Sequence, residues 1–352
     1  DKFDDLYCRY ESDESIPKST IGAQELILDL LKERSETGRI YIMNIDHCNS
    51  HSSFKDKVEM SNLCQEITLP TIPINHIDDH LGEIALCILS AVNVGKIRSD
   101  EELEDLCDLA VRGLEELIDY QDYPVKAAEL ATKARRSLGV GFIGLAHYLA
   151  KLGFDYDSQE AWDAVHGLAE SFQYYLLKAS NEVAKEKGWC ENFGRTKYSD
   201  GILPIDTYKK DVDEISSQEF QHDWESLRAS ILEHGLRHST LSAQMPSESS
   251  SVVCNATNGI EPPRDYLSIK KSKKGPLKQI VPSYGTLKNN YTLLWDMPNN
   301  TGYINIVSVM QKFFDQAISG NWSYNPEHYE NAEVPVSVMA QDFLTTYKYG
   351  WK

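Results

Sequence analysis

Three neighbouring side chains could act together in catalysis: Asn62, Cys64 and Glu66, in the run SNLCQEI at residues 61–67. Because alternate side chains of an extended segment share one face, these three would lie on the same side of a strand. The amide could orient a hydroxyl group, the carboxylate could accept its proton, and the thiol could carry out the difficult chemical step. A half-exposed strand with a buried free cysteine is the alternative, and the pattern alone favours it.

Two other segments carry candidate residues. Cys87 lies between Leu86 and Ile88 and, taken by itself, is typical of a core cysteine. The run PSESSS at residues 246–251 is rich in helix-capping residues. Backbone N–H groups and hydroxyls at the start of a helix bind anions, so this run could hold a phosphate; an ordinary serine-rich cap explains the pattern equally well.

Composition and charge limit the possible functions. The chain has 352 residues, 41% hydrophobic and 25% charged, which is typical of a soluble globular protein. No segment reaches the roughly eighteen consecutive apolar residues of a membrane span. A formal net charge of −19 would repel a phosphate backbone, so we expect no nucleic-acid partner and no membrane. We interpret the one basic run, at residues 270–275, as a solvated turn.

The seven cysteines are scattered, and no CxxC pair occurs. A chain of this length does not need disulfides for stability, so we expect a reducing, cytoplasmic location and a disulfide only as a transient catalytic state. Two apparent motifs are rejected. The GVGFIG run at 139–144 follows an expected helix rather than a strand, which argues against a dinucleotide site. The HCNSH run at 47–51 has no second ligand cluster with zinc-site spacing, so no metal site is predicted.

The order of elements predicts the fold class. Apolar residues at three- and four-residue spacing over 101–119 predict an amphipathic helix with Cys107 in its buried face. The other predicted helices are 20–37, 125–136, 141–152, 158–187, 224–234, 303–319 and 335–348. The predicted strands are 39–45, 63–69, 84–94, 237–243 and 290–296. Strands that alternate with helices indicate an α/β fold with a largely parallel sheet, open or closed, in a single domain over 1–352.

Several long segments, in order along essentially the whole chain, resemble one known family. They are TGRIYIMNIDHCNSHSSF, MSNLCQEITLP, GEIALCILSAVNVGKI, RRSLGVGFIGLAHYLAKLG, GLRHSTLSAQMPSESSS, NATNGIEPPR and GYINIVSVMQKFFDQAISGNWSYNP. They are similar to the large (alpha) subunit of class I ribonucleotide reductases, class Ia-like, in its bacterial and bacteriophage form. The resemblance implies most of a ten-stranded α/β barrel with a central finger loop, incomplete at both ends.

The resemblance also implies roles for the candidate residues. Cys64 matches the cysteine at the tip of the finger loop, which becomes a thiyl radical and removes the 3′-hydrogen of the ribose. Glu66 matches the carboxylate that accepts the 3′-hydroxyl proton, and Asn62 the amide that binds the substrate. Cys87 matches one half of a redox pair whose partner comes from an earlier strand. The diphosphate would be held by the serine-rich run, at Ser247, Glu248, Ser249 and Ser250.

The implied reaction is the reduction of ribonucleoside diphosphates to deoxyribonucleoside diphosphates for DNA synthesis. No cofactor would be bound directly, because the radical would come from a metal-containing small (beta) subunit. An external dithiol of the thioredoxin or glutaredoxin type would restore the reduced cysteines. Sulfur suits the radical step because an S–H bond and an activated sugar C–H bond are similar in strength.

The same resemblance predicts that this is an internal piece of a longer subunit. The family's ATP-binding and specificity regions would precede Asp1, and its relay tyrosines and cysteine-bearing tail would follow Lys352. We therefore expect a chain that is inactive alone and needs complementary large-subunit fragments. Two alternatives remain open: a non-catalytic assembly module of a split subunit, and a reductase of another radical class, using cobalamin or a glycyl radical. The long match over 235–264 favours class I.

Overall fold

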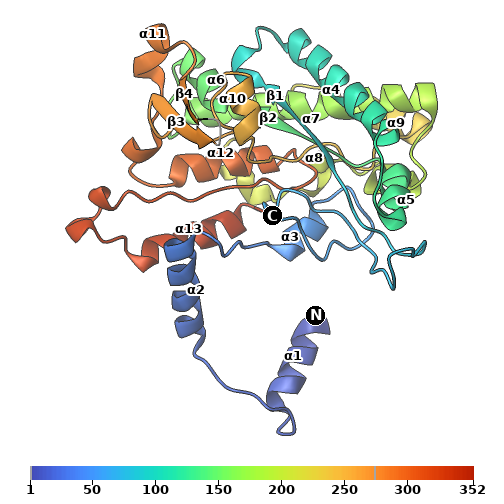
Figure 1. Cartoon of the computed structure of the whole chain (residues 1–352), viewed down its shortest axis with the longest axis horizontal. Coiled ribbons are helices and arrows are strands. Elements are labelled where there is room, and N and C mark those ends of the chain that lie inside the picture. The colour runs from blue at the N-terminus through green and yellow to red at the C-terminus, as the bar shows by residue number, and fades with distance from the viewer. Residues whose placement is uncertain (1, 273–274) are drawn as a thin grey trace. The chain divides into compact units, whose positions relative to one another are not determined.

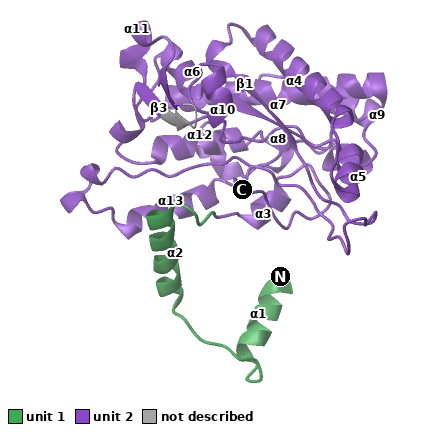
Figure 2. Cartoon of the chain, viewed as in Figure 1, with its two compact units in different colours: residues 1–41 green, residues 42–352 purple. Residues whose placement is uncertain are grey.

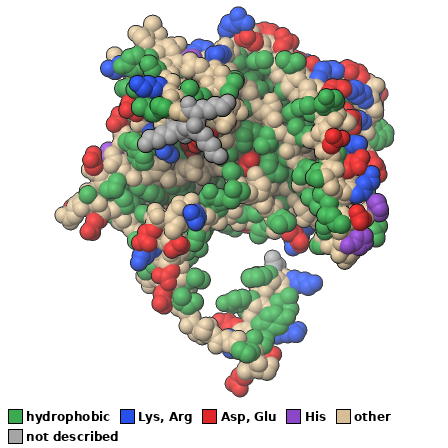
Figure 3. Space-filling model, in the orientation of Figure 1, with side chains coloured by type: hydrophobic (Ala, Val, Ile, Leu, Met, Phe, Trp, Pro, Cys, Tyr) green, Lys and Arg blue, Asp and Glu red, His purple; other side chains and the backbone are tan. Residues whose placement is uncertain are grey.

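The computed structural model describes residues 2–272 and 275–352. The chain divides into two compact units, Asp1–Tyr41 and Ile42–Lys352 (Figure 2). Acidic and basic side chains are interspersed on the face of the molecule drawn in Figure 3. The candidate residues all belong to the second unit, so its architecture determines where they lie.

The first unit contains two helices, α1 (Lys2–Ser12) and α2 (Ala23–Thr37). α2 ends at Gly38, whose φ of 64° lies in the left-handed region that glycine adopts without steric cost. The helix predicted over 20–37 is confirmed for most of its length.

Three helices form the centre of the second unit. The long helix α7 (Gln159–Lys187) packs against α4 (Asp100–Tyr120) on one side and α12 (Thr301–Gln311) on another, as Figure 1 shows. α4 begins at Ser99, whose side chain accepts a hydrogen bond from the Glu102 backbone. The apolar positions of α4 are buried as predicted: Leu103, Cys107, Val111, Leu114 and Ile118. Cys107 is therefore a core residue.

A parallel pair of strands lies beside these helices. β1 (Ile88–Asn93) pairs with β2 (Leu138–Ile143), with Ile88 opposite Leu138 and Asn93 opposite Ile143. Parallel bridges extend the arrangement from Val140 to Ser242 and from Gln244 to Ile318. The parallel sheet is thus confirmed in this part of the chain. The described residues do not form a closed barrel, and the count of ten strands stays a prediction.

The second unit has many shorter elements. Its other α-helices are α3 (Ile45–Ser50), α5 (Lys126–Arg135), α6 (Leu145–Leu152), α8 (Pro204–Thr207), α9 (Trp224–His234), α10 (Glu248–Val253), α11 (Tyr284–Leu287) and α13 (Val336–Lys348). Its 3₁₀ helices are η1 (Val94–Lys96), η2 (Phe193–Arg195), η3 (Lys197–Asp200), η4 (Lys210–Glu214), η5 (Lys288–Asn290), η6 (Leu294–Asp296), η7 (Pro326–His328) and η8 (Glu330–Ala332). An antiparallel hairpin is formed by β3 (Leu267–Ser272) and β4 (Gly275–Ile280).

Several predicted elements are wrong or differ in extent. Residues 39–44 and 63–69 are not strands, and 290–296 contains 3₁₀ turns. The predicted helix over 141–152 begins only at Leu145, because its first residues belong to β2. The helix predicted over 303–319 ends at Gln311, and the following residues extend alongside Ser242 and Gln244.

The basic run also differs from its prediction. Residues 270–272 belong to strand β3 of the hairpin rather than to a turn, and Gly275 begins β4. Lys273 and Lys274 lie outside the described residues.

Candidate active site

The loop that carries Cys64 is a compact turn, so the extended segment predicted over 63–69 is wrong. The backbone N–H of Gln65 donates to the Asn62 carbonyl at 3.2 Å, and Gln65 has a φ of 63°. The side-chain oxygen of Asn62 accepts from the Ile67 N–H at 3.2 Å. The Asn62 side chain therefore stabilises the shape of the loop through its own hydrogen bond. The alternation of side chains that was predicted for a strand does not apply to this turn.

Glu66 is buried in this loop. Its side chain is 3% exposed, and its Oε2 atom has no hydrogen-bond partner among the described residues. Its backbone carbonyl accepts a hydrogen bond from the Ala317 N–H at 3.1 Å, which fixes the loop against the segment that follows α12. A buried carboxylate oxygen with a free acceptor position is suited to receive a proton or a hydroxyl group from a ligand.

Two sulfur atoms lie within the electrostatic reach of Glu66. Burial raises the pKa of the partly buried Cys64, and the Glu66 charge raises it further. Burial also raises the pKa of Cys87 to about 12, although a hydrogen bond from Gln316 opposes the shift; Asp315 and Glu66 add to it. The Cys64 and Cys87 thiols therefore both lie within electrostatic range of Glu66, and their catalytic roles stay a prediction. All seven cysteines are free thiols.

Four charged residues fix both flanks of the loop. Arg135, which is 2% exposed, donates to Glu83 at 2.8 Å and to Asp56 at 2.9 Å. Arg195 binds the same two carboxylates, at 2.7 Å and 2.9 Å. Asp56 precedes the Cys64 loop and Glu83 follows it, so the two arginines hold its ends together. The sequence analysis did not identify this cluster, because its members are far apart in the chain.

The serine-rich run begins a helix, as predicted. Ser247 is the N-terminal boundary residue of α10, is 4% exposed, and donates its hydroxyl to the Met245 carbonyl at 3.3 Å. Glu248, Ser249 and Ser250 are exposed in the first turn. The backbone connects this run to the Cys64 loop through Ala317, whose N–H binds the Glu66 carbonyl and whose carbonyl accepts from the Gln244 N–H at 3.1 Å.

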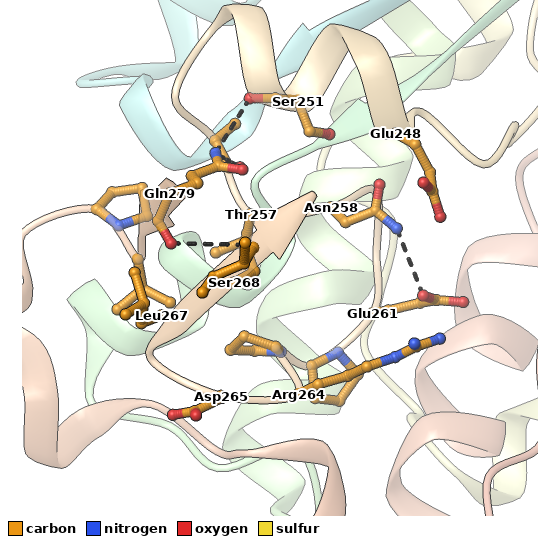
Figure 4. Close-up of a pocket in the computed structure, with 16 residues that line it drawn as sticks. Glu248, Ser251, Thr257, Asn258, Glu261, Arg264, Asp265, Leu267, Ser268 and Gln279 are labelled. Carbon is orange, nitrogen blue, oxygen red and sulfur yellow. Dashed lines mark hydrogen bonds between the residues drawn. The ribbon is translucent and has the colours of Figure 1, made fainter. Parts of the chain in front are cut away.

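A cavity of about 430 Å³ lies beside α10 (Figure 4). Ser251 is 1% exposed, lines this cavity, and has a side-chain oxygen without a hydrogen-bond partner among the described residues. On the same wall, Asn258 Nδ2 donates to Glu261 at 3.5 Å. Gln279 of β4 donates to the Ser251 carbonyl at 3.4 Å and so joins the hairpin to α10. The sequence analysis predicted the adjacent serines but not this cavity.

The two rejected motifs have structural explanations. A Cβ atom at Gly141 would lie 2.6 Å from the Ala243 carbonyl oxygen, so this glycine allows close approach of neighbouring segments. His47 contacts the Trp351 carbonyl at 2.9 Å, and His51 contacts Thr207 and the Gln311 carbonyl. In the described part of the chain, no group of three or more potential ligands could hold a metal ion. None of the described helices is long and apolar enough to span a membrane.

Comparisons with known proteins place this chain in a family. Residues 1–287 match the family described as ribonucleotide reductase, barrel domain. The chain is 58% identical to the ribonucleoside-diphosphate reductase subunit alpha of Haemophilus influenzae, over all of this chain and 47% of that protein. It is 54% identical to the ribonucleoside-diphosphate reductase 1 subunit alpha of Escherichia coli, over all of this chain and 47% of that protein. It is 42% identical to the ribonucleoside-diphosphate reductase subunit alpha of Enterobacteria phage T4, again over all of this chain and 47% of that protein. The chain thus spans about half the length of these relatives, and it belongs to the ribonucleotide reductase barrel-domain family.

Proposed function

We propose that this chain supplies the reacting cysteines of a ribonucleoside-diphosphate reductase. Its relatives are named for that activity, and the match covers the whole chain. The observation that supports the proposal most is the grouping of Cys64, Glu66 and Cys87. Burial raises the pKa of both thiols, and the nearby Glu66 carboxylate raises both further. A thiol that stays protonated within electrostatic range of a buried carboxylate is suited to the proposed reduction.

In the proposed mechanism, Cys64 reacts first, as a thiyl radical. It removes the 3′-hydrogen of the ribose and becomes a thiol. Glu66 then accepts the proton of the 3′-hydroxyl, and this eases the loss of the 2′-hydroxyl. The free acceptor position on Glu66 Oε2 supports this role. Asn62 would hydrogen-bond the substrate; its Nδ2 atom is the group for this contact, because its oxygen already accepts from the Ile67 N–H.

Cys87 is proposed as the proton donor and one half of the reductant. Its pKa of about 12, set mainly by burial, keeps the thiol protonated at neutral pH. It gives its proton to the leaving 2′-hydroxyl, which departs as water. The hydrogen of a second cysteine goes to the 2′-carbon, Glu66 returns its proton to the 3′-oxygen, and the two cysteines, having supplied two electrons to the sugar, become a disulfide. Cys64 returns its hydrogen atom to the 3′-carbon, and an external dithiol of the thioredoxin or glutaredoxin type reduces the disulfide.

The substrate diphosphate is proposed to bind at residues 246–250. The first backbone N–H groups of a helix have no intrahelical partners and attract anions. The exposed Ser249 and Ser250 add hydroxyl donors beside them, whereas the Ser247 hydroxyl already donates to the Met245 carbonyl. Ser247 and Glu66 are connected through the backbone of residues 244 and 317, so a diphosphate at α10 and a ribose near Cys64 would share one continuous wall.

The rest of the subunit is proposed to complete the barrel at β1. β1 pairs with β2 on one edge only among the described residues. Residues 90–93 of β1 also line an apolar groove of about 650 Å³, formed with α4. Leu109 and Leu117 of this groove are 67% and 47% exposed. An unpaired strand edge next to exposed leucines is suited to receive another strand, and about half of each relative lies outside the matched region.

A reduction assay with cytidine diphosphate tests the proposal. The chain is expected to be inactive alone and active when combined with the complementary large-subunit segments, the radical-generating small subunit and a dithiol reductant. Deoxycytidine diphosphate would be measured by chromatography. Full activity without the small subunit would mean that the radical has another source, and another reductase class would replace this proposal. Assembly without any product would indicate a non-catalytic module instead.

A further inference from the structure

Gln316 connects Cys87 to the loop that carries Cys64. It is 0% exposed and follows α12 in the chain. Its Nε2 atom donates to the Cys87 sulfur at 3.6 Å and to the Leu138 carbonyl at 2.9 Å. Its Oε1 atom accepts from the Thr68 backbone N–H at 3.3 Å. Thr68 lies in the Cys64 loop, so one side chain contacts both Cys87 and that loop.

The orientation of this amide is determined by its partners. The Thr68 N–H can only donate, and the Leu138 carbonyl can only accept. The oxygen of Gln316 must therefore face Thr68 and its nitrogen must face Leu138. With one N–H used by Leu138, the second N–H remains for the Cys87 sulfur. The alternative orientation would lose both backbone hydrogen bonds in a fully buried position, which is unfavourable.

The segment around Gln316 is itself held rigidly. The Nζ atom of Lys352, which is 8% exposed, donates to the carbonyls of Phe314, Asp315 and Gln316 at 3.1, 2.9 and 2.8 Å. The Asp315 carboxylate accepts from the Leu241 N–H at 2.8 Å. Because backbone and side chains fix this segment from several directions, Gln316 is a fixed donor rather than a mobile surface amide.

We propose that Gln316 is a positioning residue that holds Cys87 and the Cys64 loop in one hydrogen-bonded unit. Its N–H stabilises negative charge on the Cys87 sulfur, and its carbonyl keeps Thr68 in place. A change at Cys87 that displaces the amide, such as alkylation or disulfide formation, therefore releases the Thr68 N–H. This inference rests on the proposed function for the catalytic roles of Cys64 and Cys87. The hydrogen bonds of Gln316 do not depend on that function.

The first experiment measures how the groups around Cys87 affect the formation of its thiolate. Asp315 and Glu66 disfavour the thiolate, and Gln316 is the group that favours it. We would measure the alkylation rate of Cys87 by mass spectrometry as a function of pH, in the 352-residue chain and in Gln316→Met. Methionine has a similar shape but no donor, so at pH 9 the rate is expected to fall about tenfold, the usual effect of one hydrogen bond to a charged group.

Gln311→Met is the matched control. Gln311 is 2% exposed and donates to the carbonyls of Phe314 and Gln316 at 3.1 and 2.9 Å, but has no contact with Cys87. This variant loses the same number of backbone hydrogen bonds from the same segment. The proposal predicts an unchanged alkylation profile for Cys87. An equal fall in both variants, or no fall in Gln316→Met, would overturn the role of Gln316.

A second measurement needs no change at Gln316. In a Cys64→Ser background, where alkylation cannot occur inside the loop, Cys87 is alkylated and amide hydrogen exchange is followed. Exchange of the Thr68 amide is expected to accelerate when Cys87 is alkylated, because the displaced Gln316 no longer accepts its hydrogen bond. Unchanged exchange would refute the coupling. Neither measurement depends on turnover, so failure of the proposed reductase activity would leave both results interpretable.

Discussion

Gly139 lies directly against the sulfur of Cys87. A Cβ atom built at Gly139 would lie 2.9 Å from Cys87 Sγ and 2.6 Å from a methyl group of Leu89. Both distances are shorter than van der Waals contact, so β2 approaches β1 this closely only because residue 139 has no side chain. The glycine in the GVGFIG run therefore serves the placement of a thiol rather than the binding of a phosphate.

Gly139→Ala is expected to destabilise the chain by about 1–3 kcal/mol, the usual cost of overpacking a buried site. Denaturant unfolding of the purified variant measures this. The control is Gly113→Ala in α4, where an added Cβ meets nothing within 4 Å. It should stabilise the helix by about 0.5–1 kcal/mol, because alanine is the better helix former. Equal stability of both variants would contradict the packing explanation.

Cys64→Ser should abolish turnover of the completed enzyme, because an alcohol O–H bond is too strong to replace the thiol. Glu66→Gln should lower the rate by about 10²–10⁴-fold, the typical loss when a general base is removed. The exposed Cys8→Ser serves as a control and should keep full activity. Rates of deoxynucleotide formation would be compared at saturating substrate. Turnover of Cys64→Ser near the parent rate would refute the assignment.

Cys87 should react slowly with alkylating reagents at neutral pH. Because its pKa is raised to about 12, mainly by burial, its alkylation rate should be far below that of the exposed Cys254 at pH 7.5 and should keep rising above pH 9. In a completed enzyme, one turnover without external reductant should make Cys87 resistant to alkylation, because it becomes part of a disulfide. Mass spectrometry of alkylated peptides detects both effects. A thiol that stays alkylatable after turnover would exclude the redox role.

Lys352 should make stability depend on pH. Burial lowers its pKa from 10.5 to about 7, so above pH 7 the unfolded chain binds more protons at this residue than the folded chain. The contribution of Lys352 to the free energy of unfolding therefore increases as the pH rises from 7 towards 10.5. Lys352→Met should remove this increase, and Lys57→Met on the surface should keep it. Urea unfolding at pH 7 and pH 9 compares the two.

The groove beside β1 should be the surface where the rest of the subunit pairs. Leu109→Lys and Leu117→Lys place charges there without disturbing the core, since both leucines are exposed. They should reduce assembly with the complementary segments, measured by size-exclusion chromatography, while circular dichroism stays unchanged. Leu232→Lys on α9, where the leucine is 54% exposed, is the control and should assemble normally. Normal assembly of the two groove variants would argue against this surface.

The helices could be predicted because their signals are local. α4 and α9 carry a regular apolar pattern with a capping residue at the start, and the prediction for 224–234 has the bounds of α9. β2 was missed, and its last three residues were predicted as part of a helix, because a segment with alternating glycines does not have the composition of a strand. All six residues of β2 are buried because segments distant in the sequence pack around the strand. The local sequence gives no sign of those segments.

The sequence analysis named candidate residues for the site but did not predict how they are arranged. Cys64, Glu66 and Cys87 were predicted through a motif and a resemblance, and in the structure Glu66 lies within electrostatic range of both thiols. The turn at Gln65 was missed because it depends on a hydrogen bond from Ile67 to the Asn62 side chain. Gln316 was missed because no pattern marks an amide whose partner lies 229 positions away.

That long separation also bears on the order of folding. Thr68 and Cys87 are synthesised early, but their shared partner Gln316 comes 248 and 229 positions later. Contacts between distant positions form slowly, whereas helices such as α4 and α7 form from neighbouring residues. On a ribosome, Cys87 and Thr68 would remain without this amide until at least 229 further residues have been synthesised. The hydrogen bonds that join Cys87 to the Cys64 loop can therefore form only late in synthesis, and in a half-made chain the thiol and the loop are not yet linked by this side chain.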